Sequence, residues 1–414
     1  MITLEPPPLV TALALECREV GARALVVGGG VRDLLTERQP KDWDVEVYGL
    51  DRDALGELLA DLGTVNAVGR SFGVYKVHRR GFEMDVSIPR RDSKAGRGHR
   101  GIRVEGDPGM TPAEAARRRD LTVNAIMVDP LTGEVLDPHR GRDDLDARLL
   151  RAVDPDTFLD DPLRALRVVQ FAARLGFDVD PTLEQLCREA ALDELPAERI
   201  EGEWRKLLLD GRQPSRGLAL ARRAGLLVRL FPEVSGADGP AVDRALDRLA
   251  AAGPPLRPLA RRYAAGLATW LHRASEGAVV ATLDRLWLHR LHGYPLRDQV
   301  VRAVLHWSEP LATDADLRRL STRAEVDLAL VVRWAVEDRP EALGRRERAT
   351  ELGVLHDAPA PLLQGRHLEA LGLSPGPKMG EVLRHVYDLQ IEGEVLDHDQ
   401  ARARASAWLR EQGA

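Results

Sequence analysis

The chain has 414 residues, more than one hydrophobic core usually serves, so we expect two to four domains. Its 44% hydrophobic and 30% charged residues exclude a disordered or fibrous chain. The net charge of −6 excludes a globally basic nucleic-acid-binding surface, so a polyanion must be held locally. No export-like start or apolar run of the ~20 residues that a bilayer needs is apparent, and we expect a cytoplasmic protein without membrane contact.

Up to about residue 150 the sequence mixes strand-like alternation with helical segments, and after Pro155 it consists of amphipathic helices broken by Pro and Gly. Strands are expected at 24–27, 43–48, 74–78 and 82–88. The pattern predicts an α/β head followed by an all-α remainder. The two cysteines, Cys17 and Cys187, are too few and too far apart for a disulfide framework or a zinc site, and we expect both in the core.

A glycine turn joins the first expected strand to a helix that carries Arg32, in the segment 27–35. Three successive glycines leave backbone N–H groups open to a ligand, which makes a cradle for phosphate. Taken alone, the same glycines are equally compatible with a plain turn between a strand and a helix.

The next strand, 41–48, alternates acidic and apolar residues, so Asp42, Asp44 and Glu46 share one face. Carboxylates two residues apart on a strand lie ~7 Å apart at the backbone, close enough to converge on Mg²⁺. A second acidic strand brings Asp85 as a candidate third ligand, which predicts a site with two metal ions. The alternative is a solvated face of an edge strand, which the glycine turn just upstream disfavours.

The segment 117–126 is a cluster of arginines that leads into an apolar run. Such a cluster is usually a solvated helix end. Beside a metal site there is a second interpretation, in which the arginines bind a triphosphate. A triphosphate keeps negative charge that the metal ions do not fully offset.

The segment 158–171 predicts a helix, with acidic residues at the N-cap and Pro162 in the first turn. One stripe of this helix carries polar residues three apart, which are Asp161, Arg164, Arg167 and Gln170. A capped helix with an ion pair between residues three apart explains the stripe equally well. Alternatively, a carboxylate and a guanidinium can pair with the amino group and ring nitrogen of cytosine or adenine, whereas guanine and uracil present a carbonyl oxygen instead.

These segments, in this order, resemble the class II tRNA nucleotidyltransferase and bacterial poly(A) polymerase family over about residues 22–235. The resemblance implies a polymerase-β-like α/β head followed by an all-α neck, body and tail. The expected division is head 1–150, neck 151–235 with the base-template helix, body 236–355, and tail 356–414, which binds tRNA. It also implies addition of C and/or A from CTP and ATP to the tRNA 3′ end.

Residue by residue, the resemblance implies that Asp42 and Asp44 hold two Mg²⁺ ions, with Asp85 as the candidate third ligand. It assigns contacts with ribose and triphosphate to Gly29, Arg32, Arg119, Asp120 and Asn124. It assigns recognition of the base to Asp161, Arg164 and Arg167. Asp160 stands where the family usually has Glu, and Gln170 where Arg is common, so a nucleotide contact by Gln170 is in doubt.

Between the acidic strands and the arginine cluster, residues 90–101 form a basic segment punctuated by glycine, which we expect to be a mobile loop. It resembles the family's flexible loop and includes Lys94, Arg97 and Arg100. The loop is shortened in relatives that add only CC, so its presence favours an enzyme that adds CCA or only the final A. The resemblance does not separate these two.

Some family members carry an HD phosphohydrolase domain, which needs spaced histidines and a His-Asp pair. The histidines here are scattered, and His356-Asp357 is followed directly by Ala358-Pro359, so we expect a degenerate helical body. The closest rival function is a poly(A) polymerase on the same scaffold. A hypothesis from another functional class is an RNA-binding protein or hydrolase that lacks transfer activity. The intact Asp42 and Asp44 argue against it.

Overall fold

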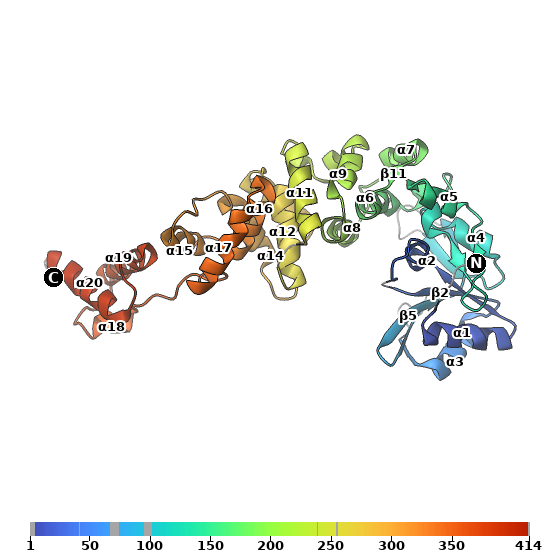
Figure 1. Ribbon diagram of the computed structural model, residues 1–414, viewed down its shortest axis with the longest axis horizontal. Coiled ribbons are helices and arrows are strands. Elements are labelled where there is room, and N and C mark those ends of the chain that lie inside the picture. The colour runs from blue at the N-terminus through green and yellow to red at the C-terminus, as the bar shows by residue number, and fades with distance from the viewer. Residues whose placement is uncertain are drawn as a thin grey trace. The chain divides into compact units, whose positions relative to one another are not determined.

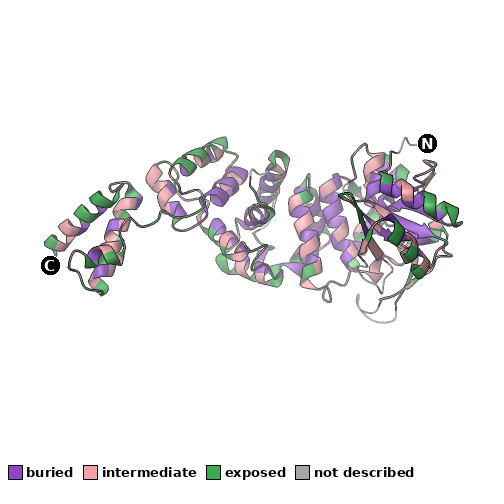
Figure 2. Ribbon diagram, turned by 90° about the horizontal axis from the view of Figure 1, so that it is seen from below, coloured by how far each residue is buried: buried purple, intermediate pink, exposed green. Residues whose placement is uncertain are grey.

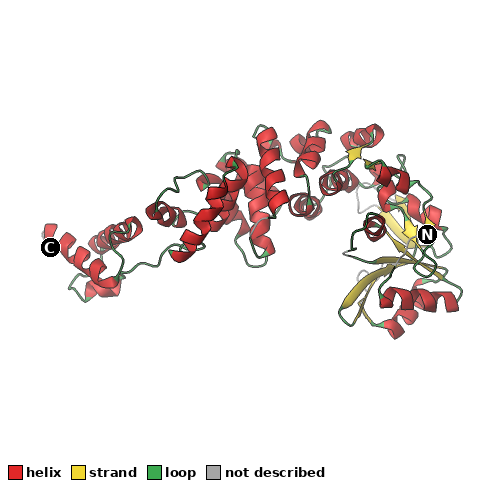
Figure 3. Ribbon diagram, viewed as in Figure 1, coloured by secondary structure: helices red, strands yellow, loops and turns green. Residues whose placement is uncertain are grey.

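The computed structural model describes residues 5–40, 42–66, 74–94, 102–237, 239–253 and 256–412. The chain forms two compact units (Figure 1). The first comprises Met1–Leu207 and Arg216–Leu230, and the second comprises Leu208–Ser215 and Phe231–Ala414. Within the described residues the strands belong to the first unit and the second is helical (Figure 3), so the expected α/β head and helical remainder are confirmed.

A mixed sheet organises the head, with the described strands in the order β3-β4-β5-β2-β1-β8-β9. Their bounds are β1 (Arg23–Val27), β2 (Asp44–Tyr48), β3 (Thr64–Asn66), β4 (Val74–Arg79), β5 (Phe82–Ser87), β8 (Met127–Val128) and β9 (Val135–Leu136). The strand β2 pairs antiparallel with β1 and parallel with β5. It is therefore an inner strand, and the alternative that its acidic residues form the face of a solvated edge strand is wrong.

Helices surround this sheet and continue into the rest of the first unit (Figure 1). They are α1 (Pro8–Glu19), α2 (Gly29–Leu35), α3 (Arg52–Leu62), α4 (Pro112–Arg117), α5 (Gly141–Asp146), α6 (Leu163–Leu175), α7 (Pro181–Glu189), α8 (Ala197–Asp210), α9 (Pro214–Arg223) and α10 (Leu226–Leu230). The 3₁₀ turns are η2 (Thr122–Asn124) and η3 (Phe158–Asp160). A short parallel pair, β10 (Leu149–Leu150) and β11 (Asp178–Val179), lies beside α5 and α7 in the chain.

Local signals in the sequence set several of these helix starts. Asp51 accepts a hydrogen bond from the Ala54 N–H at the start of α3, and Thr111 and Glu114 form a capping box at α4. The helix α6 begins at Leu163 with Pro162 as its N-cap, one residue later than a first-turn proline would place it. Hydrophobic residues fill the sheet and the inward sides of the helices (Figure 2).

Cys17 in α1 and Cys187 in α7 are both buried, as expected. Burial raises the pKa of each thiol to about 12, so both stay protonated at neutral pH. They act as small apolar core residues.

The segment 90–101 begins differently from the loop that the sequence predicts. Residues Arg90–Lys94 form the strand β6, which pairs antiparallel with β7 (Ile102–Gly106). The register runs from Arg90 opposite Gly106 to Lys94 opposite Ile102, and the antiparallel ladder pairs backbone groups that a loop would expose to water. The remaining part of the expected loop lies outside the described residues.

The second unit is built from helices, most of which bury one side and expose another (Figure 2). They are η4 (Pro232–Val234), α11 (Pro240–Ala252), α12 (Leu259–Leu271), α13 (Glu276–Arg285), α14 (Leu296–His306), α15 (Asp314–Ser321), α16 (Val326–Glu337), α17 (Pro340–Glu351), α18 (Gly365–Glu369), α19 (Pro377–Glu392) and α20 (His398–Glu411). One hydrophobic cluster joins α15, α16 and α17, and another joins α18, α19 and α20. Among the described helices, none combines the length and apolar character of a membrane span.

Gly141, the first residue of α5, packs directly on the backbone of η2. A Cβ atom at this position would lie 2.2 Å from the Thr122 carbonyl oxygen, a distance that no side chain can occupy. The adjacent Thr122 hydroxyl donates to Asp144 Oδ2 at 2.7 Å. Only glycine therefore allows α5 to hold the segment that follows the arginine cluster.

We expect Gly141→Ala to destabilise the protein by about 1–3 kcal/mol, because overpacking forces the backbone of η2 to move. The measurement is the thermal melting temperature, with Gly202→Ala as the matched control. Gly202 lies in α8 with nothing within 4 Å of an added Cβ, so alanine should be neutral or slightly stabilising there. Equal melting temperatures for the two variants would contradict the close packing at Gly141.

Candidate functional site

The glycine turn, the acidic strand and the arginine cluster meet at one place in the first unit. Gly28 has a φ of +77°, and a Cβ there would lie 3.3 Å from both Arg119 Nη1 and Asp44 Oδ2. A Cβ on Gly30 would lie 3.0 Å from the Asp42 carbonyl oxygen. Glycine is thus required at position 28 by the backbone conformation and at position 30 by the close approach of the Asp42 carbonyl oxygen.

Three carboxylates gather beside this turn. Asp44 and Asp85 are partners in the parallel pairing of β2 and β5, and the exposed Asp42 precedes β2. Burial raises the pKa of Asp44, Arg119 opposes this rise, and the charges of Asp85 and Asp42 add to it. The local negative charge is thus only partly neutralised.

Lys76 on β4 reduces the charge of one member of this group. Its ammonium lies 3.0 Å from Asp85 Oδ1 and 2.9 Å from Glu83 Oε1. Asp85 is thus already paired, whereas no hydrogen bond within the described residues occupies the carboxylates of Asp42 and Asp44. An oxygen-seeking divalent cation fits the latter pair better than a triad that includes Asp85.

Glu46, which the strand pattern places on the same face as Asp42 and Asp44, is completely buried. It accepts hydrogen bonds from Arg118 Nη2 at 2.9 Å and from the Tyr48 hydroxyl at 2.6 Å, and Arg119 Nη2 lies 4.0 Å away. Burial alone would raise its pKa, but the two guanidinium groups hold that pKa below its usual value. Glu46 therefore anchors the arginine cluster behind the carboxylates.

A buried relay of side chains links the head to α6. Arg32 Nη1 donates to Asn124 Oδ1 at 2.7 Å, and Asn124 Nδ2 donates to Asp120 Oδ1 at 3.1 Å. Arg167 Nε on α6 donates to Asp120 Oδ2 at 2.6 Å. Arg32 is also paired with Asp33 at 2.7 Å. The structure thus brings together four of the residues proposed to contact nucleotide, and in it they bind one another.

The predicted base-reading residues at the start of α6 have partners that the sequence does not indicate. Asp161 Oδ2 accepts from Arg199 Nη2 of α8 at 2.9 Å, so the ion pair of Asp161 with Arg164 that the stripe suggested is wrong. Arg164 donates instead to the carbonyl oxygens of Thr157 at 3.0 Å and Arg118 at 2.7 Å. Arg199 was not singled out as a site residue. The one feature of the sequence that could have indicated it is its positive charge within the neck, residues 151–235.

Lys94 ends β6, but its side chain lies outside the described residues, as do Arg97 and Arg100. Their proposed role stays a prediction.

Another group of metal-ligand types lies in the second unit. One ligand atom from each of Glu325, Asp327 and His356 lies within 4.8 Å of the others. These carboxylates already have cations, since Arg261 Nε lies 2.9 Å from Glu325 and Arg346 Nε lies 2.5 Å from Asp327. The group is therefore an internally neutralised ion-pair network. His356 was noted in the sequence, but its acidic partners were not.

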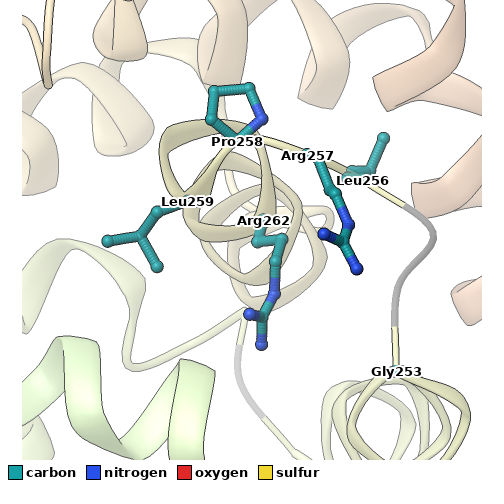
Figure 4. Close-up of a pocket in the computed structure, with 6 residues that line it drawn as sticks. All are labelled: Gly253, Leu256, Arg257, Pro258, Leu259 and Arg262. Atoms are coloured by element: carbon teal, nitrogen blue, oxygen red, sulfur yellow. The ribbon is translucent and has the colours of Figure 1, made fainter.

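The second unit also contains a pocket of about 470 Å³ at the start of α12 (Figure 4). Its lining consists of Gly253, Leu256, Arg257, Pro258, Leu259 and Arg262. None of the predicted site residues lies there, so the chemistry indicated by the sequence belongs to the first unit.

A mixed sheet with an aspartate pair on an inner strand, packed against a glycine turn that opens a helix, defines a head of the nucleotidyltransferase class. The sequence profile of the poly A polymerase head domain matches residues 24–151. That of the probable RNA and SrmB-binding site of polymerase A matches residues 176–237.

A multifunctional CCA protein of Xanthomonas oryzae pv. oryzae is 33% identical, with 86% of this chain and 95% of that protein covered. One of Xanthomonas campestris is 39% identical, but the match spans only about half of each chain, 52% in both. The solved CCA-adding enzyme of Bacillus stearothermophilus in complex with CTP has a TM-score of 0.70 at 24% identity, with 99% of each chain covered. The chain belongs to the family of class II CCA-adding enzymes and bacterial poly(A) polymerases.

The ion pair of the buried Asp120 with the half-buried Arg167 should make stability depend on pH. Although burial alone would raise it, Arg167 and Asn124 hold the pKa of Asp120 below its usual value. A depressed folded-state pKa adds stability that is complete above the unfolded value of about 3.9 and is lost as pH falls through the folded value.

We therefore expect Asp120→Asn to cost about 2 kcal/mol at pH 7, because it removes the charged hydrogen-bond partner of the half-buried Arg167 guanidinium. Urea unfolding of both proteins between pH 7 and pH 2.5 measures this. The difference should shrink as pH falls below about 4. Asp61→Asn, at an exposed carboxylate of α3, is the control. A difference that is independent of pH would contradict the ion pair.

Proposed function

We propose that this protein is a template-independent nucleotidyltransferase that adds C and/or A from CTP and ATP to the 3′ end of tRNA in the cytoplasm, releasing pyrophosphate. The observation that carries the proposal is the convergence of Gly28, Asp44 and Arg119 within 3.3 Å of one point. A phosphate cradle, a carboxylate and a guanidinium are the groups that phosphoryl transfer needs side by side. Relatives named CCA protein and solved structures with CTP and with tRNA support the substrates.

We further propose Mg²⁺ as the cofactor, held by Asp42 and Asp44. Two such ions, when bound, activate the attacking 3′ hydroxyl and stabilise the departing pyrophosphate. The protein contributes the Gly28 to Gly30 turn, whose open backbone lets phosphate approach, and Arg119, whose guanidinium lies beside Asp44. Glu46 holds Arg118 and thereby fixes the neighbouring Arg119.

The base is proposed to be read by Asp161 and Arg164. A carboxylate that accepts and a guanidinium that donates complement the amino group and ring nitrogen that cytosine and adenine share. Arg199 bonds Asp161, and two backbone carbonyls hold Arg164, so both side chains are fixed before a nucleotide arrives. Fixed groups favour selectivity because they cannot reorient to suit guanine or uracil.

The rival on the same scaffold is a poly(A) polymerase. The names of the relatives and of the solved neighbours disfavour it. The length of the segment around Arg97 and Arg100 favours addition of the whole CCA or of its final A over addition of CC alone, and it does not distinguish the first two. The division into head, neck, body and tail at residues 150, 235 and 355 remains a proposal.

A three-substrate assay tests this function. The substrates are tRNA that lacks CCA, tRNA that lacks only the final A, and complete tRNA, each supplied with CTP, with ATP and with both. We expect nucleotide addition to one or both of the incomplete tRNAs and no extension of the complete tRNA. Asp42→Ala should lower the rate at least ~1,000-fold and weaken the response to added Mg²⁺, because a metal ligand is lost.

Two controls accompany the assay. Glu83→Gln alters an exposed carboxylate of β5 that is paired with Lys76, and it should retain activity. His356→Ala should keep the same response to Mg²⁺, because its carboxylate neighbours are paired with arginines. Unlimited A addition to any RNA end, or equal rates for the wild type and Asp42→Ala, would refute the proposed function.

Replacement of Arg164 tests base selection. We expect Arg164→Ala to relax discrimination against GTP and UTP by about 10- to 100-fold, the effect of one lost base-edge contact. Single-turnover addition of each nucleotide measures it. The affinity for the triphosphate should change much less than the selectivity. Unchanged selectivity would remove Arg164 from this role.

A further inference from the structure

Three guanidinium groups surround one buried aromatic ring in the first unit. The Cζ atoms of Arg32 and Arg167 each lie 5.4 Å from the centroid of the Phe171 ring, and that of Arg174 lies 5.7 Å from it. Phe171 is buried in α6 and presents its ring to all three. We call these four residues the Phe171 cluster. The electron-rich face of the ring attracts cations, so it can gather guanidinium groups that would otherwise repel one another.

The charges of this cluster do not balance. Arg32 is paired with Asp33 at 2.7 Å, and Arg167 is paired with Asp120 at 2.6 Å. Arg174 has no carboxylate partner within the described part of the chain. Its Nη1 donates only to the neutral Gln170 Oε1, at 3.4 Å. The nearby carboxylates of Glu203 and Asp161 also act on Arg167, but each is paired with another cation, Lys206 at 2.8 Å and Arg199 at 2.9 Å. By direct ion pairs, the cluster therefore holds three cations against two carboxylates.

This excess charge is costly where the cluster lies. Burial lowers the pKa of Arg32, and the charge of Arg174 acts in the same direction, so the two groups sense each other. Water would screen such repulsion between two exposed arginines, but Arg174 is half-buried and Arg32 is buried. An anion bound at the cluster would restore neutrality.

The position of the cluster indicates which anion fits. Arg32 reaches back to the glycine turn, since a Cβ on Gly29 would lie 3.4 Å from its Nη2. The cluster thus adjoins the cradle that the proposed reaction uses for phosphate. Guanidinium groups bind phosphate oxygens through paired hydrogen bonds, and several of the Arg174 N–H groups are not used within the described residues.

We propose that the Phe171 cluster is a phosphate-binding site, in which Arg174 supplies the uncompensated charge and the buried Gln170 positions it. The choice of phosphate rests on the proposed function. It is a phosphate of the incoming nucleotide or a phosphodiester near the 3′ end of the RNA, and the two share the same chemistry.

Three variants separate this role from a structural one. Arg174→Ala removes the charge, and Arg174→Lys keeps it without the planar group. Arg18→Ala is the matched control, because Arg18 is also a last-turn arginine of a helix, in α1, without a carboxylate partner among the described residues. If Arg174 served only the dipole of its helix, both alanine variants would behave alike.

The experiment measures KM for CTP, ATP and tRNA separately, together with kcat and the melting temperature, in the full-length protein. We expect Arg174→Ala to raise KM about tenfold or more, as for a lost hydrogen bond to a charged group, with Arg174→Lys intermediate. A rise for CTP and ATP identifies the nucleotide as the source. A rise in KM for tRNA identifies the RNA as the source. In that case the salt dependence of tRNA binding should also fall by the amount expected for about one lost phosphate contact.

Calorimetric titration with inorganic tripolyphosphate provides a readout that does not depend on activity. The wild type should bind it more tightly than Arg174→Ala, even if no nucleotide is added to tRNA, so failure of the proposed function is recognised separately. Unchanged KM values and unchanged tripolyphosphate and tRNA binding in Arg174→Ala would overturn the proposal. An equal loss in Arg18→Ala, or a loss that merely follows a lower melting temperature, would also overturn it.

Discussion

The relay of Arg32, Asn124, Asp120 and Arg167 is the constraint on which the rest of the first unit depends. It runs from the helix after the glycine turn, through η2, to α6, and its central carboxylate is 7% exposed. Buried charges are tolerated only when each has its partner, so the relay permits one arrangement of these three elements. The glycine turn and the helix that is proposed to read the base are thereby fixed in one geometry.

Close backbone packing complements this relay. Gly30 lies against the Asp42 carbonyl and Gly141 against the Thr122 carbonyl, so two segments that carry chemistry are each held by a contact that a methyl group would abolish. These contacts are made by backbone atoms, so no side-chain rearrangement can relieve a clash there. The rigidity of these segments thus comes partly from glycine.

Sequence patterns predicted most of the sheet because alternation of acidic and apolar residues is a local property. Strands were expected at 43–48 and 82–88, and β2 and β5 lie within those ranges. Partners brought together by folding leave no such pattern. Arg199 pairs with Asp161 across 38 positions, and Glu46, which the alternation places on one face with Asp42 and Asp44, is buried against two arginines. Neither charge partner could be predicted from the pattern, because both pairings depend on tertiary structure.

Charge balance gives the two sides of the glycine turn opposite characters. On one side, the carboxylates of Asp42, Asp44 and Asp85 crowd together, and among the described residues the cations that act on Asp44 are Arg119 and Lys76, so negative charge is in excess. On the other side, the Phe171 cluster has one guanidinium more than its carboxylates. A triphosphate with its metal ions offers a cation to the first and anionic oxygens to the second. In a chain of net charge −6, the proposed binding of a polyanion at this place thus depends on a charge excess that is created by local pairing and not by composition.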